Sequence, residues 1–247
     1  MSLALEHFPW AYFALAFLAG GSVKGALGVG LPLVTIPLLS FVMPGMQAIA
    51  LMAMPVMLSN VWQAIEGADV RGGLRRFGGL IAAQLVATVV TVNFTLSLSP
   101  AGLNIMLAGS VLLAVALMAF QPTLHISAAR ERVVGVGVGT LSGLLGGISS
   151  LTGPVIITYL MALRLSRDQF VSSISIIYLG GSLPLYGAMA WHGRFGWTEM
   201  ALSCLALVPM ALGLRLGKSV RSRLNEQLFR RVLLVFLTLL ALLLIFR

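Results

Sequence analysis

The sequence predicts an all-α polytopic membrane protein with eight hydrophobic segments in two inverted repeats. Of its 247 residues, 59% are hydrophobic and only 9% are charged, and the mean hydropathy is +1.01. An ordinary soluble domain is about 45–50% apolar and about 25% charged. Long stretches of the chain carry no charge, and a glycine-rich break followed by proline occurs twice. This composition excludes soluble enzymes, nucleic-acid-binding domains and disordered scaffolds.

Gaps between charged residues define the segments in order along the chain. A bilayer core of about 30 Å takes roughly 20 helical residues. No Asp, Glu, Lys or Arg occurs from Phe77 to Ala129, and turns at Pro44-Gly45 and Ser99-Pro100 divide the longer gaps. The resulting segments are 8–43, 46–66, 77–98, 101–121, 131–164, 168–190, 195–215 and 229–246.

The first and fifth segments are too long for a single straight span, and each contains a helix breaker. As continuous helices they would measure about 50 Å, well beyond the hydrocarbon thickness. The break in the first segment runs from Gly25 to Pro32, and the break in the fifth runs from Gly143 to Pro154. Each segment is therefore either one interrupted span or a re-entrant hairpin that enters and leaves on the same face.

The two breaks indicate an internal repeat. Aligning Pro32 with Pro154 also aligns Asn60 with Ser182. We therefore expect residues 1–247 to form a single transmembrane transporter domain, with repeat one at 8–121 and repeat two at 131–246.

The distribution of Lys and Arg favours hairpins over single spans. If both long segments are single spans, the basic residues outside the breaks divide eight to seven between the two sides of the membrane. If both are hairpins, the division is thirteen to two, and only Arg194 and Arg247 lie on the outer side. The positive-inside rule expects such a bias, and it also accounts for the net charge of +9 without a nucleic-acid partner. Both termini then face outward, and the second half is inverted relative to the first, as in many transporters.

The breaks are the candidate anion site. A half-helix that begins inside the membrane presents free N–H groups and the positive end of its dipole. Pro32 and Pro154 suit the first helical position, where their missing N–H costs nothing. For the glycines of the breaks, tight helix packing is the alternative. Packing is preferred for Gly135, Gly139 and Gly143, which form a G-x-x-x-G-x-x-x-G run. The candidate substrate-binding residues are Lys24, Gly25, Gly28, Gly30, Pro32, Asn60, Ser149, Ser150, Thr152, Gly153, Pro154 and Ser182.

Lys24 is the most informative candidate, because a cation in the membrane core usually marks a functional site. Its alternative is snorkelling of the long side chain to the surface. For Asn60 and Ser182 the alternative is a hydrogen bond between helices. That alternative is preferred for eight weaker candidates, which are Gln47, Gln63, Gln84, Asn93, Asn104, Gln169, Tyr178 and Tyr186.

Other function classes lack their motifs. The chain has no P-loop pattern G-x-x-x-x-G-K-[ST], no H-E-x-x-H and no G-x-S-x-G, so we expect neither ATP hydrolysis nor an enzyme. With a single cysteine, Cys204, and three histidines far apart in the sequence, we expect no disulfide, no metal site and no cofactor.

The glycine-rich break from Gly20 to Pro32, its second copy from Gly139 to Pro154, the size and the two-fold repeat resemble the TauE/SafE family of sulfite and organosulfonate exporters. The resemblance covers essentially the whole chain. It implies secondary export of small sulfur-containing anions such as sulfite or organosulfonates across a prokaryotic cytoplasmic membrane. An importer or a channel for another small anion, and a non-transporting membrane assembly factor, are the alternatives. The coupling ion, a proton or sodium, and a homodimer are left open.

Overall fold

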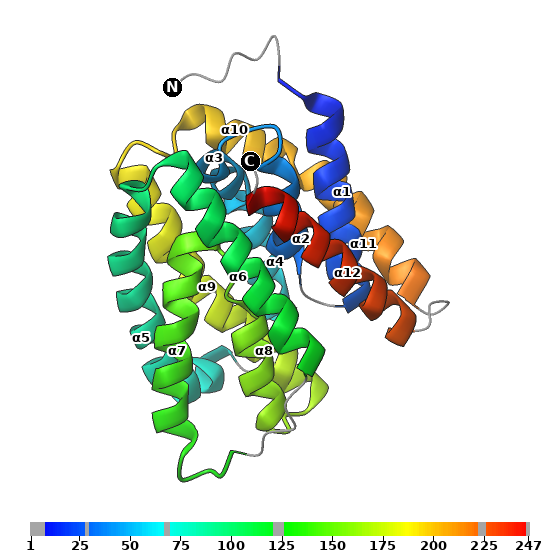
Figure 1. The fold of residues 1–247 in the computed structure, drawn as a ribbon. Coiled ribbons are helices and arrows are strands. Elements are labelled where there is room, and N and C mark those ends of the chain that lie inside the picture. Colours follow the sequence, from blue (N-terminus) through cyan, green and yellow to red (C-terminus); the bar gives the residue numbers. More distant parts are fainter. Residues whose placement is uncertain (1–7, 28–29, 67–69, 121–125, 222–225, 246–247) are drawn as a thin grey trace. The chain divides into compact units, whose positions relative to one another are not determined.

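Helices make up the regular structure of the described chain. The computed structural model describes residues 8–27, 30–66, 70–120, 126–221 and 226–245, which form twelve helices and no strand (Figure 1). The helices are α1 (Trp10–Leu27), α2 (Leu31–Leu39), α3 (Gly45–Leu51), α4 (Ala53–Glu66), α5 (Val70–Leu96), α6 (Pro100–Phe120), α7 (Glu131–Ser149), α8 (Gly153–Ala162), α9 (Arg167–Trp191), α10 (Trp197–Leu205), α11 (Leu207–Arg221) and α12 (Glu226–Ile245).

Six stretches of the described residues are helical, long enough and apolar enough to cross a bilayer, so the chain is a multi-pass membrane protein. They fall in six of the eight predicted segments, and the exceptions are 8–43 and 229–246. The apolar part of α12, Leu233–Ile245, is shorter than a span. The count of eight segments stays a prediction. The six stretches are Gly45–Ile65, Val70–Leu96, Pro100–Ala119, Glu131–Ser149, Ser172–Trp191 and Trp197–Ser219.

The chain divides into two compact units that do not follow the predicted repeats. Unit 1 comprises residues 1–56, 99–112 and 189–247, and unit 2 comprises residues 57–98 and 113–188. Each unit therefore contains one of the two breaks together with helices from the other predicted repeat.

In unit 1, α2 folds back along α1. The hydroxyl of Tyr12 donates a hydrogen bond to the carbonyl of Leu38 at 2.9 Å, and the hydroxyl of Thr35 donates to the carbonyl of Ala16 at 3.3 Å. From the first pair to the second, the residue number increases on α1 and decreases on α2. The two helices are therefore antiparallel. This geometry is the one that a hairpin requires.

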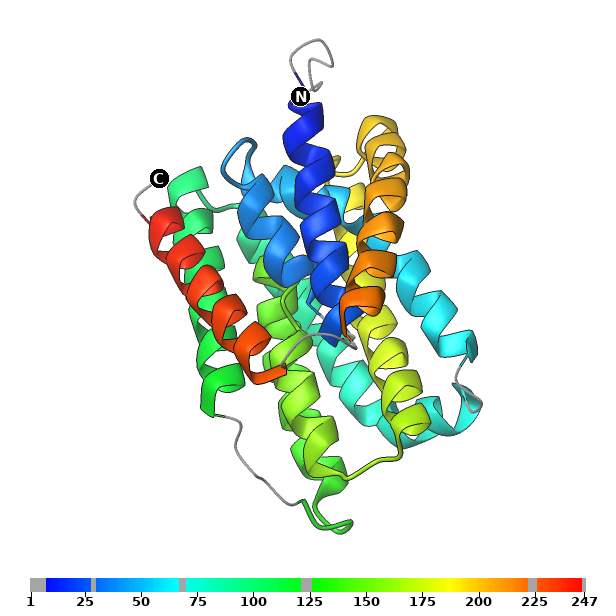
Figure 2. The same ribbon diagram turned by 90° about the vertical axis from the view of Figure 1, so that its right-hand side faces the viewer.

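The other neighbour of α1 is α11, and α1 lies between α2 and α11 (Figure 2). The backbones of α1 and α11 are in direct contact. A Cβ at Gly21 would overlap the carbonyl oxygen of Met210, and one at Gly25 would overlap that of Leu214. Glycines on α11 have the same relation to α1: a Cβ at Gly213 would overlap the carbonyl oxygen of Leu18. Small residues four apart on both helices allow this close parallel packing.

Unit 2 contains the second break and repeats both features. The hydroxyl of Tyr159 on α8 donates to the carbonyl of Glu131, at the start of α7, at 3.1 Å. At the other end of α7, a Cβ at Gly146 would stand 2.7 Å from Cγ2 of Thr152. The pairs 131–159 and 146–152 place α8 antiparallel to α7.

The helix that packs in parallel against α7 is α5. A Cβ at Gly139 would overlap the carbonyl oxygen of Leu80, and a Cβ at Gly143 would overlap that of Gln84. These two glycines belong to the G-x-x-x-G run of α7, for which packing is the preferred interpretation of the sequence. The structure confirms that role for both.

Candidate substrate-binding site

The first break ends where α2 begins, in unit 1. Gly30 precedes α2 with φ of +105°, a left-handed conformation that favours glycine. A Cβ there would also stand 3.2 Å from Cγ1 of Val23. Its carbonyl accepts the hydrogen bond from the N–H of Val34 at 3.3 Å. Gly30 thus has a conformational role at the break, and Gly28 lies outside the described residues.

The second break lies between α7 and α8 in unit 2. Ser150 ends α7 with φ of +58°, and its N–H donates to the carbonyl of Gly146 at 2.9 Å. Thr152 precedes α8, and its carbonyl accepts from the N–H of Ile156 at 3.4 Å. The chain reverses direction within the three residues from Ser150 to Thr152.

Both prolines stand one position later than expected. Leu31 and Gly153 are the first helical residues, so Pro32 and Pro154 are second rather than first. The prediction of the first position was wrong because the carbonyls of Gly30 and Thr152 already accept the first helical bonds. The physical argument is unchanged, since the second N–H of a helix also lacks an intrahelical partner.

Neither half-helix is capped by a side chain. Gly30 has none, and the side chain of Thr152 makes no capping hydrogen bond to α8. The first N–H groups of α2 and α8 are therefore available to a ligand or to water, because no helical carbonyl precedes them. This is the arrangement that favours an anion at a helix N-terminus.

The hydroxyls predicted as ligands are partly used within their own helices. Ser149 donates to the carbonyl of Leu145 at 2.8 Å, and Ser182 donates to that of Leu179 at 3.2 Å. Asn60 is buried in α4 and, like Ser182, belongs to unit 2. The ligand roles of Ser149, Ser182 and Asn60 stay predictions.

Lys24 is buried in the last turn of α1, with only 6% of its surface exposed. Snorkelling would require an exposed side chain, so the burial favours a functional role of Lys24 over snorkelling. The next residue, Gly25, packs against the backbone of α11, and such packing is the alternative to ligand binding for the glycines of the breaks. Ligand roles for Lys24 and Gly25 stay predictions.

Two polar side chains of unit 2, both weaker ligand candidates from the sequence, have buried polar atoms without a hydrogen-bond partner among the described residues. Gln84 is fully buried in α5, and neither atom of its amide has a hydrogen-bond partner among the described residues. The hydroxyl oxygen of Tyr178 is also buried without such a partner, and it would stand 2.8 Å from a Cβ at Gly153. Unpartnered buried polar groups are costly and uncommon, so each calls for an explanation.

A signal for Gln84 exists in the sequence. Gln84, Thr88, Thr91 and Thr95 follow one another at intervals of four, three and four residues, and all four are buried in α5. This spacing places them on one face of the helix. A polar stripe on the buried face of an apolar helix predicts a polar lining, which the residue types taken singly do not.

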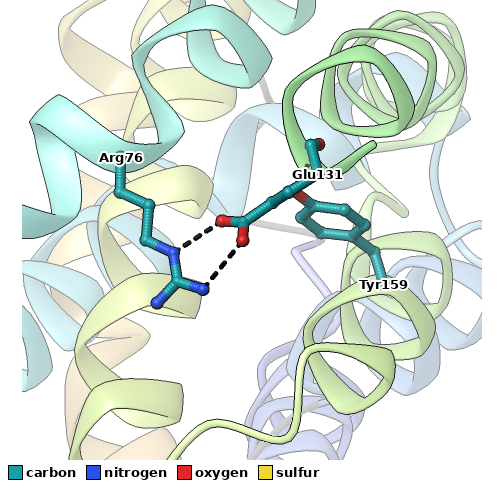
Figure 3. A network of polar contacts seen from close by, with 3 residues as sticks. All are labelled: Arg76, Glu131 and Tyr159. Carbon is teal, nitrogen blue, oxygen red and sulfur yellow. Dashed lines mark hydrogen bonds and ion pairs between the residues drawn. The ribbon is translucent and has the colours of Figure 1, made fainter. Parts of the chain in front are cut away.

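An ion pair joins the N-terminal parts of α5 and α7 in unit 2. Nε of Arg76 on α5 lies 2.6 Å from Oε1 of Glu131 on α7, and a second nitrogen of Arg76 lies 3.0 Å from Oε2 (Figure 3). The hydroxyl of Tyr159 on α8 donates a hydrogen bond to the main-chain carbonyl of Glu131 (Figure 3). The network joins α5, α7 and α8. The side chains of Arg76 and Glu131 are partly exposed, and that of Tyr159 is buried.

Comparison with known proteins gives one family. The sequence model of the family described as "Sulfite exporter TauE/SafE" matches residues 12–244. No curated protein matches the chain, and no solved structure does. Among the described residues, no group of three or more His, Cys, Asp or Glu side chains is placed to hold a metal ion.

Proposed function

Because the chain belongs to the sulfite exporter TauE/SafE family, a family of membrane transporters for sulfur anions, we propose that it exports sulfite or organosulfonates by a secondary mechanism. The observation that carries the proposal is the second break. There α8 begins without a side-chain cap, and the unpartnered hydroxyl of Tyr178 lies against its first residue, Gly153. Free N–H groups beside a buried hydroxyl donor suit the oxygens of a small anion.

Lengths of the hairpin arms support a site deep in the membrane. The ten residues of α8 measure about 15 Å, and the nine of α2 measure about 14 Å. If each hairpin returns to the face from which it started, α2 and α8 begin near the middle of a core about 30 Å thick. Transporters built from broken helices bind their substrates at that depth.

Helix bounds and packing support the inverted repeat. Adding 122 to the residue numbers of α1 gives 132–149, which agrees with α7 (Glu131–Ser149). Adding 122 to those of α2 gives 153–161, which agrees with α8 (Gly153–Ala162). In both units the helix before the break packs in parallel against a helix of the other predicted repeat. In unit 1, α1 packs against α11, and in unit 2, α7 packs against α5. With hairpins, thirteen basic residues lie on the cytoplasmic side of a prokaryotic membrane and both termini lie outside.

Flux from proteoliposomes tests the function. Purified chain is reconstituted into vesicles loaded with sulfite, and efflux is followed under a pH gradient, under a sodium gradient and without either. We expect efflux that depends on one of the gradients and shows counterflow. Efflux without counterflow would indicate a channel instead, and vesicles as tight as protein-free ones would contradict the proposal.

A further inference from the structure

Unit 2 contains a closed ring of contacts around the start of α8. On α5, Gln84 and Thr88 stand one turn apart. The Gln84 amide extends to α9, where a Cβ at Gly181 would overlap its Nε2. Three residues earlier on α9, Tyr178 brings its hydroxyl against Gly153 of α8.

The ring closes through α7. Thr152, directly before α8, lies against Gly146, where a Cβ would stand 2.7 Å from its Cγ2 and 3.7 Å from Oγ1 of Thr88. Thr88 in turn donates to the carbonyl of Gly143 at 3.3 Å. These contacts thus link four helices, α5, α7, α8 and α9, and pass through the N-terminus of α8. Among the described residues, the Gln84 amide and the Tyr178 hydroxyl of this ring have no hydrogen-bond partner.

We propose that the α8 site, formed by Gln84, Tyr178 and the first N–H groups of α8, binds the transported substrate as a monovalent oxyanion. This rests on the proposed function. Gln84 can donate two hydrogen bonds and Tyr178 one, and in the part of the chain that the structure describes these groups have no partner to give up when an anion enters. Two glycines keep the groups in place, since a side chain at Gly181 or Gly153 would displace them.

The limited positive charge of the α8 site favours a substrate with a single negative charge. None of the side chains joined in the ring is ionisable to a cation, so the positive potential comes from the half-charge of the α8 N-terminus and from neutral donors. The cost of removing an ion from water grows steeply with its charge and needs compensation by a partner. A sulfonate or hydrogensulfite, with one negative charge, fits such a site better than the sulfate dianion.

Two probes of similar shape and fixed charge test the proposal. Isothermal titration on the purified full chain in lipid nanodiscs compares methanesulfonate, a monoanion, with sulfate, a dianion. We expect methanesulfonate to bind at least about tenfold more tightly, about 1.4 kcal/mol. Equal affinities, or tighter binding of sulfate, would overturn the assignment to monovalent anions.

Variants test the two side chains. Gln84→Met and Tyr178→Phe each remove donors while keeping the volume, and each should weaken methanesulfonate binding at least about tenfold, as loss of a hydrogen bond to a charged group does. Gly181→Ala should act like Gln84→Met, because the added methyl displaces the amide. The matched control is Gly187→Ala on the same helix, where nothing lies within 4 Å of the new Cβ, and its affinity should equal that of the unaltered chain.

Stability without ligand separates a binding role from a structural one. Tyr178→Phe loses no hydrogen bond to a described residue, so its melting temperature without anion should not fall. Tyr159→Phe loses the bond to the Glu131 carbonyl, so it should melt lower and yet bind methanesulfonate normally.

Failure of this inference can be told from failure of the function. If Gln84→Met, Tyr178→Phe and Gly181→Ala all bind methanesulfonate like the unaltered chain while that chain still exports sulfite, the groups contact only water and the inference is wrong. If the unaltered chain neither binds these anions nor exports sulfite, the proposed function is wrong and the inference with it.

Discussion

Lys24 is a buried cation of unit 1, and its substitution tests whether the first break binds the substrate. At 6% exposure, its charge costs several kcal/mol unless it is paired or hydrated. We expect Lys24→Gln to weaken sulfite binding at least about tenfold, about 1.4 kcal/mol, in isothermal titration. Lys24→Arg should retain partial transport, since the charge stays but its position changes. Lys24→Glu should not transport.

The matched control is Lys218→Gln, because Lys218 is an exposed lysine on the neighbouring helix α11. It should bind sulfite as the unaltered chain does. Unchanged affinity and efflux in a well-folded Lys24→Gln variant would remove Lys24 from the site.

Gly153 offers a second test at the scale of one residue. Even a Cβ at this position stands 2.8 Å from the Tyr178 hydroxyl, so the larger side chain of Gly153→Leu should fill the space in front of α8. We expect sulfite efflux from proteoliposomes to be lost while membrane insertion is retained. Gly28→Leu, in the first break, should have the same effect. Gly187→Leu is the control, and full efflux by an inserted Gly153→Leu variant would argue that the second break lies outside the transport path.

Among elements, the parallel pair of α5 and α7 shows how glycines set the helix separation. The carbonyl of Gln84 lies where a Cβ of Gly143 would be, so the two backbones touch. In a membrane such contacts stabilise helix pairs through close packing rather than through the hydrophobic effect. The same holds for α1 and α11 in the other unit.

Gly143→Ala should therefore destabilise the fold by about 1–3 kcal/mol, the usual cost of overpacking. Gly137→Ala on the same helix meets nothing within 4 Å and should be neutral or stabilising by up to about 1 kcal/mol, because alanine favours helices over glycine. Unfolding free energies measured in detergent micelles compare the two. A Gly143→Ala variant as stable as Gly137→Ala would contradict the close contact.

For the whole molecule, the predicted topology can be checked by labelling. Replacement of Cys204, an exposed and unpaired cysteine, provides a cysteine-free background. Single cysteines at Ser127, Arg167 and Arg194 are then labelled from one side of the membrane. We expect 127 and 167 to react from the cytoplasm and 194 from outside, because the Lys and Arg distribution favours that arrangement. Labelling of 127 and 167 from opposite faces would replace the hairpin by an interrupted span.

At the same scale, the sequence by itself determined that the chain is helical, membrane-spanning and broken at two places. Charge gaps set the segments because charged residues are expensive in hydrocarbon, and the family follows from the same residues. Glycine and proline marked the breaks correctly because they act on their own backbone, whatever surrounds them.

Only the tertiary structure decided which helices meet, and with that the composition of the candidate site. Each unit combines one break with helices from the other half of the sequence, so Gln84 meets α9 and Gly25 meets α11. The hydroxyls of Ser149 and Ser182, candidate ligands by residue type, each donate to a carbonyl of their own helix, and their ligand roles stay predictions. Hydrogen-bond partners depend on which neighbours are present, and in a bundle the neighbours come from distant parts of the chain.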